Sequence, residues 1–384
     1  MKIRAKNCCK KLYKKIQSNA LKIILNFVSK GKLLGLFQFN KEFQINNELT
    51  LNNYRYEYNK IEIEITLVEG KAGKYVNLER GNYQFIKITA DKAKEINIIN
   101  LPKNHNIKKI KIQIIGLKSL KFLFNNCKNI KVANFITFHK LGFKDFQYMF
   151  KGCSSLEKLN ISKLKTECAK DMSCMFLGCS LLKEINLEAL NTANVESMSF
   201  MFSGCKNLRK IKLPKQGPYH LIYMAHMFNG CQSLKELDLS NFGVSKVKSM
   251  EFMFYNCSSL KNINLTYFFS YDLTDTSFMF CGCSSLENIN LFCLKTKNVK
   301  NMAYMFYGCS LLKELDLSNF STLNVKSLKK MFYGCLLLKT LNISNFKVNN
   351  KTNLKDLFGK CDRLKELDCN DKLILHEFKE NNNI

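Results

Sequence analysis

The sequence predicts an α/β solenoid of about ten strand–loop–helix turns, each 26 residues long. Ten cysteines stand 26 residues apart, from Cys127 to Cys361, without insertion or deletion. The twenty-third residue after each of the first nine is phenylalanine, as at Phe254 and Phe306. Because a fixed period of this length places equivalent residues one above another in stacked turns, it is the sequence signature of a solenoid.

One repeat, residues 309–334, shows how each turn is expected to fold. Leu315 and Leu317 alternate with polar residues, which is typical of a half-buried strand. From Val325 the apolar spacing becomes that of a short helix. A glycine after this helix, such as Gly334, can end it in a left-handed conformation, and an Asn or Asp before it can cap it. The expected caps are Asn194, Asp272, Asn298, Asn324 and Asn350.

The pattern LxxLxLSNF followed by NVxxMxxMFxGC resembles the BspA-like leucine-rich repeat. Residues 238–242 match the strand end of that repeat, and residues 298–309 match its helix. The resemblance covers about 120–370 and weakens at 214–220, where PKQGPYH replaces the usual loop. It implies a leucine-rich-repeat solenoid used for binding, often as an adhesin, and it brings no catalytic residues.

Residues 1–41 form a basic segment with eleven Lys or Arg and no acidic residue. Its apolar residues lie close to one face of an expected amphipathic helix, with lysines on the other. Two hypotheses remain open: the helix caps the first solenoid turn, or it contacts an anionic membrane surface. The lysines available for membrane contact are Lys10, Lys11, Lys14, Lys15 and Lys22. We expect neither a membrane-spanning helix, which needs about 20 apolar residues, nor a secretory signal.

The rest of the chain is expected to form three parts. Within residues 42–118, apolar and polar residues alternate at 60–68 and 84–90. This alternation predicts a β-rich N-terminal region that merges into degenerate first turns of the solenoid. The solenoid is expected over 119–370, and 371–384 is expected to be a C-terminal tail with a short cap.

The formal charge of +29 has two explanations. A basic chain is typical of nucleic-acid or membrane partners. Abundant Asn, Lys, Ile and Phe without Trp instead indicate the usage of an AT-rich genome, which we favour as the main source. Nucleic acid is not the expected partner, because strand lysines such as Lys235 stand beside acidic residues such as Glu236, and no aromatic ladder accompanies them.

The ten periodic cysteines are expected to be buried free thiols. Stacked turns hold equivalent side chains parallel, which does not provide the dihedral angle near 90° of a disulfide. Free thiols favour a reducing compartment, hence the cytoplasm, with the cell surface by an unrecognised export route as the alternative. We expect no metal site, because Cys281 and Cys283 are the only close pair in the repeats.

Function is expected on the outward residues of the strands, on the concave face of the solenoid. No pattern for catalytic, metal or cofactor-binding residues is found. The candidate partner-binding residues are Glu236, Asp238, Asn264, Asn290, Glu314, Asp316 and Asn342. We therefore expect a non-enzymatic protein-interaction scaffold for a protein or peptide. The alternatives are an adhesin-like surface protein, or membrane or nucleic-acid association through the basic N-terminus.

Overall fold

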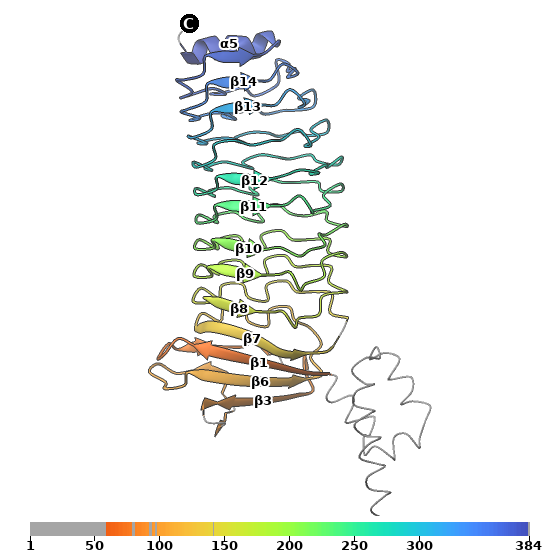
Figure 1. The fold of residues 1–384 in the computed structure, drawn as a ribbon, viewed down its shortest axis with the longest axis vertical. Coiled ribbons are helices and arrows are strands. Elements are labelled where there is room, and N and C mark those ends of the chain that lie inside the picture. Colours follow the sequence, from red (N-terminus) through yellow and green to blue (C-terminus); the bar gives the residue numbers. More distant parts are fainter. Residues whose placement is uncertain (1–58, 79–80, 92–93, 97, 141, 383–384) are drawn as a thin grey trace, which may run out of the picture. The chain divides into compact units, whose positions relative to one another are not determined.

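The computed structural model describes residues 59–78, 81–91, 94–96, 98–140 and 142–382. The chain divides into two compact units, 1–60 and 61–384, and nearly all described residues belong to the second. The helix expected in 1–41 lies outside the described residues. The second unit is a stack of coils (Figure 1). We number the coils from the cysteine that begins each one, so that the first starts at Cys127 and the tenth, which is partial, at Cys361.

Short parallel strands stack on one side of the coils, as the alternation predicted. β13 (Glu314–Asp316) pairs in register with β14 (Thr340–Asn342), and β14 pairs with β15 (Glu366–Asp368). The middle residue of each, such as Leu315, is buried or half-buried, and its two neighbours point outward. The remaining repeat strands are β8 (Lys158–Asn160), β9 (Glu184–Asn186), β10 (Lys210–Lys212), β11 (Glu236–Asp238) and β12 (Asn262–Asn264).

The helix predicted for each turn is not found, so the α/β assignment is wrong for the repeats. Between residues 120 and 370 the described chain contains reverse turns where the helices were expected. In the seventh coil, alternate N–H groups donate to carbonyls of the next coil at 2.8–3.0 Å: those of Met302, Tyr304, Phe306 and Gly308. The N–H groups that directly follow three of these, those of Met305, Tyr307 and Cys309, donate to the carbonyl three residues earlier. A helix would need bonds four residues back.

This turn segment requires two left-handed residues in each coil. One is at the position of the glycine predicted to end the helix, and these glycines have φ between +70° and +76°. Asn126, Asn256 and Lys360 replace glycine there and have φ between +55° and +57°. The other lies four residues earlier and is not glycine, as at Tyr304 with φ +60°. The same position is left-handed at Phe122, Tyr148, Cys174, Phe200, His226, Phe252, Phe278, Lys330 and Asp356. Such a conformation costs an L-residue roughly 1–2 kcal/mol, so the geometry is imposed by the bonding between coils.

The expected helix caps have a different role. The side-chain amides of three of them donate to backbone carbonyls of the preceding coil. The bonds run from Asn194 to Glu167, from Asn298 to Tyr271 and from Asn324 to Lys297, at 2.8–3.0 Å. These asparagines therefore tie neighbouring coils together rather than capping a helix.

The phenylalanine column predicted by the repeat is confirmed. Ten buried rings stack through the core from Phe124 to Phe358, with neighbouring centroids 5.1–6.0 Å apart. Each ring covers the faces of its neighbours, so that no coil has a closed core of its own.

The ten periodic cysteines are buried, as expected, and they also form hydrogen bonds. The thiol of Cys283 donates to the carbonyl of Phe254 at 3.1 Å. That carbonyl also accepts the N–H of Cys257, so the thiol uses its second lone pair. All nine cysteines from Cys153 to Cys361 repeat this bond, each to the carbonyl of the phenylalanine 29 residues earlier.

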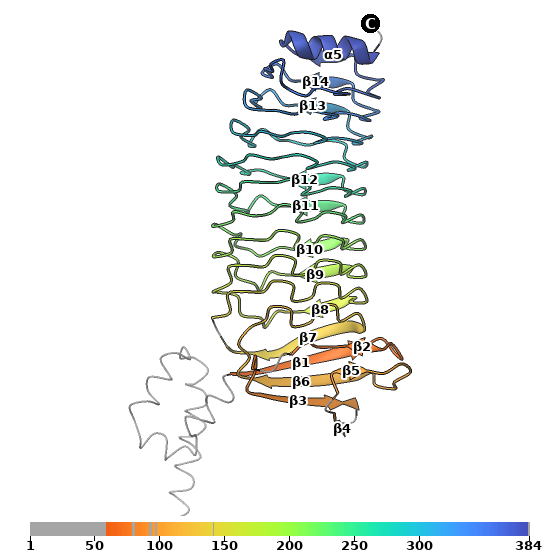
Figure 2. The ribbon, with the colours of Figure 1, turned by 180° about the vertical axis from the view of Figure 1, so that it is seen from behind.

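An antiparallel sheet covers the first coil (Figure 2). β1 (Lys60–Leu67) pairs antiparallel with β7 (Ile130–Phe138) of the first coil, which pairs parallel with β8. The sheet continues outward through β6 (Lys109–Ile115), β3 (Phe85–Ala90) and β4 (Lys94–Glu95), while β2 (Gly73–Lys74) pairs with β5 (Asn100–Leu101). Residues 109–115 are therefore a strand of this cap.

The C-terminal end of the stack is covered by α5 (Lys372–Asn382). Ile374 is fully buried, and Phe378 packs edge-on against Phe358 at 5.4 Å. Asp371 caps the helix through the N–H of Leu373 at 2.9 Å and also accepts the N–H of Val348. In the described part of the chain, no helix is both long and apolar enough to cross a membrane.

Replacing Phe252 separates this turn geometry from a helix. Phe252 has φ +53° and stacks between His226 and Phe278, with centroids 4.7 and 4.4 Å away. Phe252→Gly and Phe252→Ala both lose the stacking, but only alanine keeps the left-handed strain. We expect the glycine variant to be the more stable in urea unfolding by roughly 0.5–1 kcal/mol. In a helix alanine would be the more stable, so that order would contradict the geometry.

The thiol column predicts sensitivity to alkali. Burial raises the pKa of Cys205 and Cys257 to about 12, whereas an unfolded cysteine titrates near 8.5. Between these values the unfolded chain loses protons that the folded chain keeps, so the free energy of unfolding falls as pH rises, by up to roughly 1.4 kcal/mol per pH unit for each thiol. We expect a steep loss of structure above about pH 9, measured by circular dichroism.

Cys257→Ala provides the control for this prediction. It should be less stable at neutral pH, yet its free energy of unfolding should fall less steeply with pH, because one buried thiol is gone. The ten periodic thiols of the native chain should also resist iodoacetamide at pH 8 until the chain unfolds. Rapid alkylation of the native column, or an unchanged pH slope in the variant, would be inconsistent with buried, protonated thiols.

Candidate functional site

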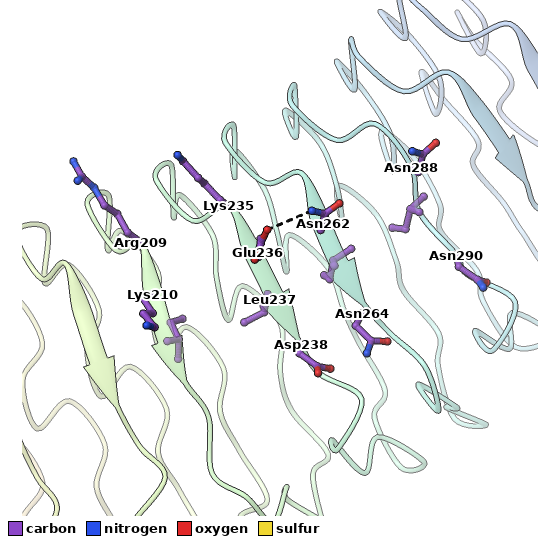
Figure 3. Close-up of a pocket in the computed structure, with 13 residues that line it drawn as sticks. Arg209, Lys210, Lys235, Glu236, Leu237, Asp238, Asn262, Asn264, Asn288 and Asn290 are labelled. Atoms are coloured by element: carbon purple, nitrogen blue, oxygen red, sulfur yellow. Dashed lines mark hydrogen bonds between the residues drawn. The ribbon is translucent and has the colours of Figure 1, made fainter.

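All seven candidate residues lie on the side formed by the strands, which we call the strand face. The first hollow on this face has a volume of about 1110 Å³ and crosses β10, β11, β12 and residues 288–290 (Figure 3). It contains Glu236, Asp238, Asn264 and Asn290. The second hollow, of about 650 Å³, contains the other three candidates: Glu314, Asp316 and Asn342. Asn288 and Ile289 line both hollows, so the two adjoin.

The first hollow joins basic, acidic and amide groups in sequence along the stack. Figure 3 shows Arg209 and Lys235 along one edge, with Asp238, Asn264 and Asn290 in a row across three successive coils. Glu236 accepts a 3.5 Å hydrogen bond from the amide of Asn262. Each coil therefore adds polar groups that can donate or accept hydrogen bonds.

The second hollow is acidic. Four carboxylates line it, those of Glu314, Asp316, Glu366 and Asp368. Thr340 and Asn342 of the intervening coil separate them, and none of the residues lining this hollow is basic. An acidic hollow in a chain of net charge +29 is a local departure from the composition.

The Asn and Asp residues of the strand face also shape the backbone. Asp238 Oδ1 accepts the N–H of Ser240 at 2.9 Å, in an Asx turn directly after the strand. The same bond forms at Asn160, Asn186, Asn264, Asn290, Asp316 and Asn342. One side-chain oxygen of each therefore holds the turn, while the second polar atom remains on the outer surface. The periodicity of this column is structural in part, which the sequence did not reveal.

Sequence reasoning missed residues at both ends of the face. Arg209 and Lys210 line the first hollow, and Glu366 and Asp368 line the second, yet none was among the candidates. Lys210, Glu366 and Asp368 occupy the same repeat columns as the candidates, and Arg209 occupies the column next to them. Extending the candidate columns to every coil would have found the first three.

A second cluster of titratable groups lies on the turn side. His226 is stacked between Phe200 and Phe252, with centroids 4.2 and 4.7 Å away, and burial lowers its pKa. Burial, with the nearby Asp275, raises the pKa of Glu251, whose carboxylate lies 3.9 Å from His226 Nε2. Within the described ranges, no group of three or more His, Cys, Asp and Glu side chains is arranged to hold a metal ion. The arrangement provides a packed ring rather than a reactive centre.

The coil geometry defines a leucine-rich-repeat type of solenoid. Residues 118–216, 219–288 and 264–370 match the family described as "Mycoplasma protein of unknown function, DUF285". Because the match spans well over half of the sequence, this chain belongs to the DUF285 family.

Two solved structures are similar to this chain. A crystal structure of a TLR13–ssRNA13 complex has 17% identity and a TM-score of 0.26, covering 68% of this chain and 40% of that one. The Leptospira interrogans LRR protein LIC12759 has 17% identity and a TM-score of 0.23, covering 60% of this chain and 65% of that one. The match thus spans less than two thirds of either, and likeness at this level indicates no function. No curated protein matches the sequence.

Proposed function

We propose that this protein is a non-enzymatic scaffold that binds an extended protein or peptide segment along its strand face. The observation that supports this most directly is the pair of adjoining hollows, which contain every candidate residue. Leucine-rich-repeat solenoids commonly serve as binding scaffolds, and stacked repeats provide an extended surface for such a partner. Neighbouring strands lie about 4.8 Å apart. The five coils that carry the candidate residues therefore span the length of about six residues of an extended peptide.

The charges of the face define the chemistry of the partner. Lysine or arginine side chains would be attracted to Glu314 and Asp316 in the second hollow. An acidic side chain would be attracted to Arg209 and Lys210 at the other end of the first. Such complementarity favours one direction of the bound segment and speeds its association.

Two finer assignments belong to this proposal. The motif at 298–309 supports a BspA-like repeat, and with it an adhesin-like role at the cell surface as the alternative. The hydrogen-bonded thiol column supports a reducing compartment such as the cytoplasm, because oxidation would remove the donors. The two assignments lead to opposite expectations for the oxidation state of the cysteines.

A second role for residues 1–41 is contact with an anionic membrane surface through Lys10, Lys11, Lys14, Lys15 and Lys22. The other hypothesis was that these residues cap the first solenoid turn. β1 pairs with β7 of the first coil and so already covers that end of the stack. Membrane association of this kind would fall steeply with salt, because exposed charges are screened over about 10 Å at 0.1 M.

Partner capture with a neutralised strand face tests the main proposal. The variant Glu236→Gln/Asp238→Asn/Glu314→Gln/Asp316→Asn removes four charges but keeps the amide oxygens needed for the Asx turns. The matched control, Glu167→Gln/Asp171→Asn/Glu196→Gln/Asp356→Asn, removes four charges from other sides of the coils. We expect the strand-face variant to capture at least about tenfold less of the proteins that the parent and the control capture. A tenfold loss corresponds to about 1.4 kcal/mol of binding free energy, and losing the charge pairs of four residues is enough to cause it.

Deleting residues 1–41 separates the two roles. Capture by the strand face should survive this deletion, whereas binding to vesicles of anionic lipid should be lost. If the strand-face variant captures the same proteins as the parent while the deletion abolishes capture, the strand face is not the binding surface.

A further inference from the structure

In the middle of the stack, the most highly exposed large apolar side chains lie on a side of the coils other than the strand face. This loop side consists of the loops after the strands of the fourth to eighth coils: 214–222, 240–248, 266–274, 292–300 and 318–326. Its large exposed side chains are Tyr219 (55% exposed), Tyr267 (68%), Tyr271 (65%), Phe292 (69%) and Leu323 (66%). Four of the five are aromatic, so several ring surfaces are open to solvent.

The same five loops are strongly basic. They contain seven exposed lysines and one acidic residue, Asp272. The lysines are Lys215, Lys246, Lys248, Lys295, Lys297, Lys300 and Lys326. Among the described residues, none of the seven forms an ion pair, whereas Lys212 and Lys313 of the strand side pair with Glu188 and Glu287. Ion pairs with the described residues therefore do not neutralise the positive charge of the loop side.

Loops of the second and third coils provide an internal comparison. Residues 162–170 and 188–196 contain three lysines and three glutamates, and two of these lysines are ion-paired. None of the large exposed hydrophobic side chains of the described residues lies in them. Genome composition acts on all coils alike, so it does not account for charge and exposed rings appearing together in the fourth to eighth coils.

Tyr267 shows that the exposed rings are not explained by packing. The fifth, eighth and ninth coils place asparagine at this position. Its amide donates to the preceding coil, as from Asn241 to the carbonyl of Pro214 at 2.8 Å. Tyr267 cannot form that bond, and it has a left-handed φ of +66°. Compared with those three coils, the sixth coil thus lacks a bond between coils and carries instead a ring that is 68% exposed.

Phe292 is held beside the strand face by its backbone. Its N–H donates to Asn290 Oδ1 at 3.0 Å, and its carbonyl accepts the amide of Asn319 at 2.9 Å. The ammonium group of Lys295 lies 5.7 Å from the ring centroid. A fixed aromatic ring with a lysine next to it is therefore presented to solvent.

We propose that the loop side binds single-stranded nucleic acid. Unpaired bases stack on exposed aromatic rings, and phosphates are attracted to unpaired lysines, which are the two features that such sites combine. Equivalent loop positions repeat about every 4.8 Å, so the five loops form a track of roughly 20 Å for a few nucleotides. An acidic peptide would satisfy the lysines but would not require four open rings. This site differs from the strand face and does not depend on the function proposed there.

Fluorescence anisotropy with labelled dT12 and rU12 tests this proposal on the full chain. The first variant, Tyr271→Ala/Phe292→Ala, removes two stacking surfaces, and we expect affinity to fall at least about tenfold. The second, Lys295→Gln/Lys297→Gln, should lower the slope of log affinity against log salt by about 1.4, since each phosphate contact contributes about 0.7 for a single strand.

Matched controls separate a site from general attraction between opposite charges. Lys183→Gln/Lys261→Gln removes two exposed lysines from the strand side and should leave the salt slope unchanged, and Leu336→Ala, at a side chain 47% exposed in the ninth coil, should leave affinity unchanged. Thermal unfolding of every variant should match that of the parent.

Three results would overturn the proposal. One is no binding of either oligonucleotide at 50 mM salt. Another is an equal loss of affinity in the loop-side and strand-side variants, which would assign binding to net charge or to residues 1–41. The third is stronger competition by poly-glutamate than by unlabelled dT12, which would identify an acidic polypeptide as the occupant.

Discussion

The fold depends on how the turn side of each coil divides its N–H groups. Alternate groups bond to the next coil, and the groups between them close local turns, so the segment 302–309 is bonded along its whole length. One residue per coil also forms a parallel bridge, in an unbroken series from Asp145 to Asn353. The strand ladder is interrupted by comparison, since residues 288–290 belong to no strand. The turn side therefore sets the 26-residue period.

This constraint explains which residue types recur in each coil. The bonding pattern needs a left-handed residue at Gly308 and another at Tyr304, although the second carries a side chain. Stacking repays part of that strain, because Tyr304 lies 4.5 Å from Phe278 and rings at this position follow one another through several coils. In the core, Phe306 stacks on Phe280, and the thiol of Cys309 donates to the backbone carbonyl of that same Phe280.

The sequence was sufficient to predict those features of the fold whose residue pattern has a single physical explanation. The period, the strand alternation at Leu315 and Leu317, and the phenylalanine column each have a single explanation in a stacked fold, and all were predicted. The helix was not predictable in this way, because apolar residues spaced like Val325, Leu328 and Met331 line one side of a helix and equally of successive reverse turns. What distinguishes the two is the bond each N–H forms with the next coil, and a single repeat does not contain that partner. The strand-face residues followed from the columns, but their Asx turns depend on local backbone geometry.

Residues that break the repeat are the ones most informative about function. The turn side tolerates few substitutions, because its hydrogen bonds link every coil to two neighbours. The outward side chains of the strands and loops contribute few of these bonds. A departure there needs another cause. Tyr267 is one, since it presents an exposed ring where Asn241, Asn319 and Asn345 form a bond between coils. Column analysis overlooked it because columns average over the coils. The periodic part of this protein thus describes how it is built, and the exceptions on its exposed sides support the binding site proposed for the loop side.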